Sequence, residues 1–237
     1  MKPKSILNLL NAGAAEKDLL TVRAEADGSL TLVIYEAIDD WYGVSARSVR
    51  DAVASYEGET IHVRLNSPGG DVFEGRAMMT TLAEHSARVV VHVDGLAASA
   101  AAVLALAADE VIIADGAFMM IHDGWSYLAG NSAELKERAA LLDKVDASIV
   151  AAFAKRTGKD AEQIVAWMAA ETWFSSAEAL EHGFADTTTE TVTTSASARF
   201  DLSGYSNTPK ALAKADEPDA PKETWEDASR RLAFLSK

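Results

Sequence analysis

Short runs of β-branched residues alternate with segments of helical periodicity along the first half of this 237-residue chain, and this alternation restricts the folds open to it. Three runs have the length and composition of strands, at residues 29–35, 60–65 and 88–94. Helical patterns follow them at about 45–56, 73–85 and 97–108, with Gly95 breaking the third strand. Strands that alternate with helices form βαβ units with parallel pairing. We therefore predict an α/β fold, with two further short strands at 111–113 and 117–121.

The second half of the chain is mainly helical. Asn131 and Glu134 have the spacing of a capping box, and a long amphipathic segment at 132–155 follows. Gly158 ends this segment, and a shorter helix is expected at 161–170.

The C-terminal part carries weaker patterns. Residues 171–186 indicate turns, and the polar, proline-containing stretch from Thr187 to Glu223 indicates a linker or disorder. A short amphipathic helix is expected at 224–235. It and the segment Arg199–Leu202 are candidates for docking a partner or for removal by self-cleavage, with a plain linker as the alternative. We expect an N-terminal segment (1–19), one compact domain (20–190) and a C-terminal tail (191–237).

Charge and composition exclude several classes of function. The chain has 22 basic and 36 acidic side chains, a net charge of −14, which disfavours nucleic-acid binding. It has no cysteine, no HExxH motif and no Walker-type phosphate loop, so we expect no metal, no cofactor and no nucleotide hydrolysis. No apolar stretch is long enough for a bilayer, and the N-terminus lacks the long apolar core of a signal peptide. A cytoplasmic protein without membrane contact is expected.

Residues 66–70, Asn-Ser-Pro-Gly-Gly, follow directly on a predicted strand. Loops at the carboxyl ends of strands are where α/β sheets place ligands. Proline fixes one φ angle and the glycines allow positive φ, so such a loop can present an amide N–H to a developing negative charge. A plain strand-to-helix turn is the alternative.

Ser99 lies between a strand end and an alanine-rich helix. A hydroxyl there benefits from the free N–H groups of the helix N-terminus, of which Ala100 supplies one. Small neighbours leave room for a polypeptide. A serine that only packs or caps the helix is the alternative.

His122 follows the apolar strand that ends at Ile121, and its position suits a general base. A structural histidine is the alternative. The acidic residues available to orient it are too numerous for spacing alone to choose among them: Asp123, Glu171, Glu178, Glu181 and Asp186.

Taken in order, four motifs resemble the Clp protease proteolytic subunit, a serine peptidase family. They are NSPGG at 66–70, GLAAS at 95–99, MMIHD at 119–123 and FSSAEALEHG at 174–183. The resemblance covers about residues 30–188 and implies a ClpP/crotonase-type spiral of βαβ units, with 132–155 as a projecting handle helix.

The resemblance also implies roles for individual residues. Ser99 matches the family's nucleophile and His122 its general base, while Gly70 and Ala100 match the backbone donors of the oxyanion hole. The family's third triad member is usually Asp; the matching position here is Glu171, one methylene longer.

Other departures point to a subgroup. The acidic, alanine-rich composition and the long tail look more like the Clp-type proteases of bacteriophage head-assembly regions. That likeness implies processing of scaffold, capsid or portal proteins in the host cytoplasm, by a ring-forming homo-oligomer. No feature demands an ATPase partner.

Two other functions compete with the peptidase hypothesis. A crotonase-like acyl-CoA enzyme shares the spiral and the paired oxyanion donors, but uses other acid–base residues and usually has basic residues for the CoA phosphates. A catalytically inactive ring component keeps only the fold.

Overall fold

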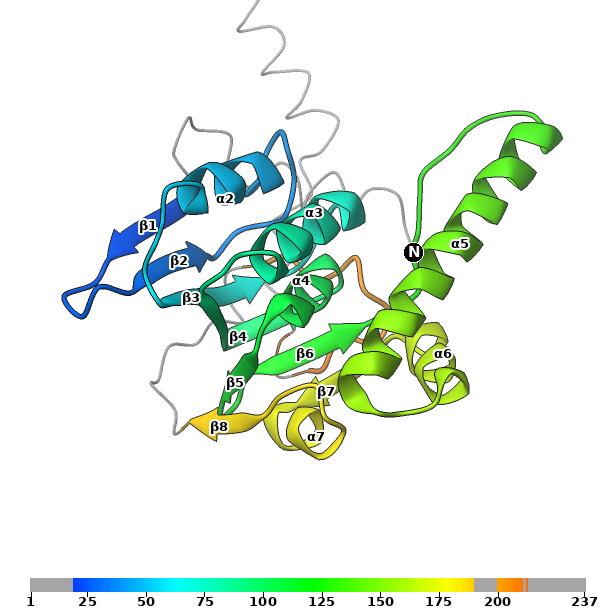
Figure 1. The fold of residues 1–237 in the computed structure, drawn as a ribbon. Coiled ribbons are helices and arrows are strands. Elements are labelled where there is room, and N and C mark those ends of the chain that lie inside the picture. The colour runs from blue at the N-terminus through cyan, green and yellow to red at the C-terminus, as the bar shows by residue number, and fades with distance from the viewer. Residues whose placement is uncertain (1–18, 190–199, 211, 213–237) are drawn as a thin grey trace, which may run out of the picture.

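The computed structural model describes residues 19–189, 200–210 and 212. An eight-stranded sheet forms the body of this part of the chain (Figure 1). Its strands are β1 (Leu20–Ala24), β2 (Leu30–Ile34), β3 (Thr60–Ser67), β4 (Arg88–Ala98), β5 (Glu110–Ala114), β6 (Phe118–Ile121), β7 (Thr172–Ser175) and β8 (Thr187–Thr189). The helices are α2 (Ala46–Val53), α3 (Val72–Ala83), α4 (Ala100–Leu104), the 3₁₀ turn η1 (Ala105–Ala107), α5 (Ser132–Thr157), α6 (Ala161–Ala169) and α7 (Ser176–Glu181).

The strand order is β1-β2-β3-β4-β5-β8, with β6 joined to β4 and β7 joined to β6. All these pairings are parallel except β1 with β2 and β6 with β7. The predicted α/β fold with parallel βαβ pairing is thus confirmed.

Strand β4 pairs with β3 along one edge, and its other edge is divided between two strands, β5 and β6. Its first half, Val90–Val93, pairs with β5, whereas its second half, Leu96–Ala98, pairs with β6. The prediction that this strand breaks at Gly95 is wrong, because pairing with β6 carries it on to Ala98. The expected helix at 97–108 therefore begins only at Ala100 and continues as η1.

A layer of α2, α3 and α4 covers one face of the sheet (Figure 1). Alternate strand residues point into this layer, as the side-chain period of two requires. Val89, Val91 and Val93 of β4 are each at most 1% exposed. The core is built mainly from valine, leucine, isoleucine and alanine, which suits the low aromatic content.

Helix α5 projects from the body of the molecule (Figure 1). The predicted capping box is confirmed, since Asn131 accepts from the Glu134 amide and Glu134 accepts in return from Asn131. Gly158 ends the helix in the left-handed conformation with φ of 70°.

Other short elements differ from the expectation. The turn region 171–186 contains β7 and α7, and β1 was not foreseen. Thr187–Thr189, expected to begin a linker, is strand β8 beside β5. These strands are three to five residues long, and pairing with distant residues stabilises them.

The tail also differs from a plain linker, because residues 200–210 and 212 pack against the body. Phe200, Leu202 and Leu212 are buried with residues of β4 and β6 in a second apolar cluster. Figure 1 shows this segment in orange. The expected helix at 224–235 lies outside the described residues.

Candidate active site

Ser99 lies at the sharp junction between β4 and α4. Its backbone has φ 55° and ψ −120°, a conformation rare for a residue with a side chain. Its amide donates to the Met120 carbonyl at 2.9 Å, and its carbonyl accepts from the amides of Ala102 and Val103. Such strain persists only where the surrounding structure enforces it, and here it turns the half-buried hydroxyl into a cavity.

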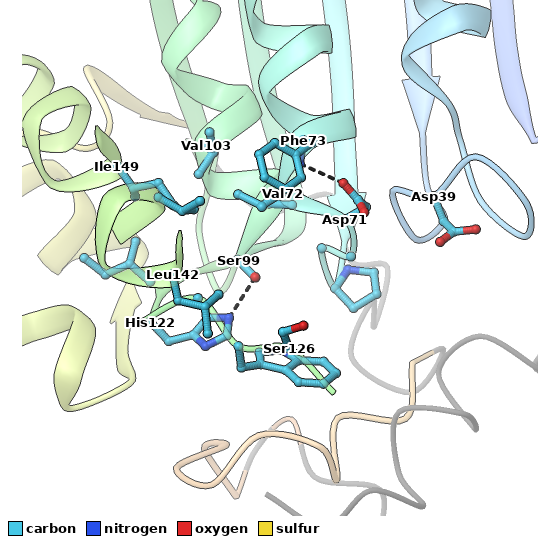
Figure 2. Close-up of a pocket in the computed structure, with 18 of the residues that line it drawn as sticks. Asp39, Asp71, Val72, Phe73, Ser99, Val103, His122, Ser126, Leu142 and Ile149 are labelled. Atoms are coloured by element: carbon cyan, nitrogen blue, oxygen red, sulfur yellow. Dashed lines mark hydrogen bonds between the residues drawn. The ribbon is translucent and has the colours of Figure 1, made fainter. Parts of the chain in front are cut away.

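His122 comes directly after β6, the strand that pairs with the second half of β4. Because the two strands are parallel, their ends lie side by side, and His122 Nε2 is 2.8 Å from Ser99 Oγ. Figure 2 shows the two side chains pointing toward one another. Burial lowers the pKa of His122, while the carboxylates of Glu171 and Asp123 oppose this shift. The imidazole is therefore neutral near pH 7 and able to accept a proton.

The loop before α3 brings two glycines against this pair. Gly69 has φ of 87°, and a methyl group there would lie 2.4 Å from the Ala98 carbonyl oxygen. Its neighbour Gly70 forms a parallel bridge with Ile38. In this bridge the Ile38 amide donates to the Gly69 carbonyl, and the Asp71 amide donates to the Ile38 carbonyl. The bridge does not use the amide of Gly70 itself, and Gly70 lines the same cavity as Ser99.

Ala100 supplies a second backbone donor. It is the first residue of α4, where amides have no acceptor within the helix. Its nitrogen lies close to Gly69, 3.0 Å from where a methyl group at that glycine would be. The structure therefore brings together four of the predicted site residues: Gly70, Ser99, Ala100 and His122.

A cavity of about 360 Å³ opens beside Ser99. Its inner wall is apolar and comes largely from α4 and α5, as Val103, Leu142 and Ile149 show in Figure 2. Phe153 also lines the cavity and is only 2% exposed. Polar groups, among them Asp39, Asp71 and Ser126, line other parts of the same cavity.

Glu171 lies in the turn between α6 and β7, with φ of 49°. Its carboxylate accepts from the backbone amides of Ser206 at 2.9 Å and Asn207 at 2.7 Å, and from Trp173 Nε1 at 3.3 Å. It is close enough to raise the pKa of His122, but no hydrogen bond joins it to that imidazole among the described residues. The structure thus places Glu171 near the Ser99–His122 pair, but the hydrogen bonds of its carboxylate are made with other residues.

The remaining carboxylates have different positions. Glu178 forms a capping box with Ser175 at the start of α7. Asp186 accepts from the Val111 amide and forms an ion pair with Arg156. Asp123 adjoins His122 and acts on it through charge alone.

Tyr205 is a site residue that was not predicted from the sequence. Its hydroxyl donates to the Pro68 carbonyl oxygen at 2.6 Å, and its ring meets the His122 ring edge-on at a centroid distance of 5.6 Å. Burial raises the pKa of Tyr205, so the hydroxyl stays protonated. The one available signal was an aromatic residue, with Phe200 and Leu202 shortly before it, in an otherwise polar tail.

Within the described residues, no group of three or more histidine, aspartate or glutamate side chains is arranged to hold a metal ion. In the same part of the chain, no helix has both the length and the apolar character needed to cross a bilayer.

A family model described as Clp protease matches residues 50–192. The ATP-dependent Clp protease proteolytic subunit 2 of Tropheryma whipplei is 32% identical over 130 residues, covering 54% of this chain and 72% of that protein. The proteolytic subunit of Porphyromonas gingivalis is 29% identical over 131 residues, covering 54% of this chain and 59% of that protein.

Among solved structures, a ClpP1 mutant from Listeria monocytogenes superposes with a TM-score of 0.61 at 26% identity. The match covers 68% of this chain and 92% of that one. The predicted ClpP-type α/β fold is thereby confirmed.

Proposed function

This chain belongs to the Clp protease family, and we propose that it is a serine endopeptidase with Ser99 as nucleophile and His122 as general base. The observation that carries the proposal is the 2.8 Å contact between His122 Nε2 and Ser99 Oγ at the edge of an open cavity. A hydroxyl within hydrogen-bond reach of a neutral imidazole is the arrangement that nucleophilic catalysis requires.

The reaction proceeds through an acyl-enzyme. His122 removes the proton of Ser99 as Oγ attacks the peptide carbonyl carbon, and the negative charge moves to the carbonyl oxygen. The amides of Gly70 and Ala100 donate to that oxygen. The imidazolium then protonates the leaving amine, and the same histidine activates a water molecule that hydrolyses the ester. Glu171 stabilises the imidazolium through its charge, which supports its assignment as the acid of the triad.

The cavity supports a preference of the enzyme for certain substrate side chains at the position just before the cleaved bond. That side chain lies next to the carbonyl under attack, and the space beside Ser99 is walled by Val103, Leu142 and Ile149. An apolar side chain fills such a wall without leaving a polar group unpaired. We therefore expect cleavage after apolar residues.

Helix α5 supports an oligomer. Leu135 and Leu141 are 46% and 40% exposed on a helix that projects from the body. Apolar side chains on a projecting helix are typical of a subunit interface. A homo-oligomeric ring is the assembly proposed.

The biological setting proposed is the maturation of bacteriophage heads in the host cytoplasm, with scaffold, capsid or portal protein as substrate. The acidic composition and the long tail support it. Incubating the protein with candidate head proteins and mapping the cut sites by mass spectrometry tests this point.

Active-site labelling tests the chemistry itself. A fluorophosphonate probe is expected to label wild-type protein and to leave Ser99→Ala unlabelled, with hydrolysis of a fluorogenic peptide lost in the same variant. Removing a triad nucleophile typically costs about 10⁴-fold or more in kcat. Ser99→Ala hydrolysing at the wild-type rate would rule out the assignment, and an unlabelled, inactive wild type would favour a structural ring component or an acyl-CoA enzyme.

A further inference from the structure

The described tail residues 200–210 and 212, hereafter the strap, pack against the strands that lead to Ser99 and His122. Phe200, Leu202 and Leu212 are 8%, 3% and 6% exposed. They pack with Leu96 and Ala98 of β4, with Met120 of β6 and with neighbouring aromatic rings. Burial of three large apolar side chains anchors the strap to the two strands that carry Ser99 and His122.

Beyond these buried residues, the strap contacts Glu171, the proposed acid of the site. The amides of Ser206 and Asn207 donate to different oxygens of Glu171, and the Asn207 side chain donates to the Ala170 carbonyl at 2.7 Å. A glutamate side chain has three rotatable bonds, and donors on both oxygens restrict the conformations it can adopt. A carboxylate has about four acceptor positions, so these donors leave capacity for the imidazole of His122.

Tyr205 connects the base with the oxyanion loop. Its ring packs edge-on against His122, and its hydroxyl donates to Pro68, two residues before Gly70. One side chain therefore restrains both groups whose relative position decides the reaction. It does so without closing the site, because the Ser99–His122 contact is intact and the cavity stays open with Tyr205 in its wall.

We propose that the strap is an intrinsic part of the catalytic site, in which Tyr205 and the Ser206–Asn207 amides are positioning groups for His122, the Pro68–Gly70 loop and Glu171. The inference rests on the proposed peptidase function. It assigns the tail a role in turnover, in place of a linker or a segment to be cut away. The strap holds the base, the loop and the acid, whereas the apolar wall of the cavity comes from α4 and α5. It therefore acts on the rate of the chemical steps more than on substrate binding.

The test uses full-length variants in the fluorogenic peptide assay. Tyr205→Ala is expected to lower kcat about tenfold or more with KM changed less than about threefold, because alignment and not binding is lost. Tyr205→Phe keeps the ring against His122 and should recover part of the loss. Leu202→Asp places a charge in the buried cluster that anchors the strap and should detach it, so this variant is expected to lower kcat by a similar factor. Leu180→Asp is the matched control, since Leu180 is 41% exposed on α7, and its kcat should stay within about twofold of wild type.

A double mutant checks whether the strap acts through Glu171. In the Glu171→Gln background, Leu202→Asp should cost distinctly less than it does alone, because groups that act as a unit are not additive. The full loss in that background would overturn the assignment of Glu171 as the strap's target.

The outcomes separate the two proposals. If wild type neither labels with the fluorophosphonate nor cleaves, the peptidase function fails, and the strap's role fails with it. If wild type cleaves while Tyr205→Ala and Leu202→Asp cleave equally fast, the strap has no part in turnover. Faster cleavage by these variants would identify the strap as a built-in inhibitor and would likewise overturn the inference.

Discussion

Gly69 lies so close to Ser99 that a methyl group at Gly69 would be 2.7 Å from Ser99 Cβ. The same methyl group would lie 2.4 Å from the Ala98 carbonyl oxygen, which belongs to the end of β4. The Pro68–Gly70 loop and the turn at Ser99 are therefore in close contact, and no side chain fits between them at Gly69.

The first prediction concerns this contact. Gly69→Ala should abolish peptide hydrolysis and lower the free energy of unfolding by about 2 kcal/mol or more, since strained backbone and overpacking act together. Gly116→Ala is the matched control, because Gly116 has a comparable φ of 77° but no atom within 4 Å of the added methyl group. Gly116→Ala should lower the free energy of unfolding only by the backbone strain, and its peptide hydrolysis should stay at the wild-type rate. Equal loss of activity in both variants would show that the close contact with Ser99 is not what matters.

The second prediction concerns pH. Burial holds the pKa of His122 below 6.5, and the reaction needs the neutral imidazole. The value of kcat/KM should therefore fall as the pH drops through a midpoint below 6.5. Glu171→Gln removes the charge that raises this pKa, so its midpoint should lie at still lower pH, besides its loss of rate. A pH–rate profile of both proteins measures this, and a midpoint that rises in Glu171→Gln would contradict the assignment of Glu171 as the acid whose charge acts on His122.

The third prediction concerns specificity. Leu142 lines the cavity beside Ser99, and Leu142→Ala enlarges that space. The ratio of kcat/KM for a peptide with Phe before the cleaved bond to that with Leu should rise by about tenfold, the usual effect of fitting extra apolar volume. Leu135→Ala, on an exposed part of the same helix, should leave the ratio unchanged. If both variants give the wild-type ratio, the cavity does not receive that side chain.

A fourth prediction concerns stability. Phe174 of β7 is 2% exposed and packs against the rings of Trp167, His182 and Phe184. Phe174→Ala should lower the free energy of unfolding by about 3–5 kcal/mol, as removal of a buried aromatic ring does. Urea denaturation measures this, and Phe174→Leu should cost less because most of the volume remains. A loss below about 1 kcal/mol for the alanine variant would mean that this cluster is not part of the cooperative core.

The sequence was enough to predict the segments whose signals are local. The strand before residues 66–70 and the histidine after β6 each depend on neighbouring residues in the chain, and the capping box at Asn131 is visible as a spacing. The contact between Ser99 and His122 follows from parallel pairing of β4 with β6, which the βαβ pattern suggests.

The rest depends on contacts between distant residues. Strand β8 has three threonines and no apolar face, and only its pairing with β5 makes it a strand. The bonds from Ser206 and Asn207 to Glu171 are made by backbone amides across 35 and 36 residues, and backbone amides leave no trace in a sequence. For this reason the sequence does not predict the partners of Glu171, although the motif resemblance points to Glu171 itself.

The division of one edge of β4 between β5 and β6 has a consequence for how the site assembles. Ser99 meets His122 only when the first half of β4 is in register with β3 and β5 and the second half with β6. A shift of one residue would turn every side chain of the strand to the opposite face. An incompletely folded chain therefore lacks the contact between Ser99 and His122, which forms only when the distant strands around β4 have paired.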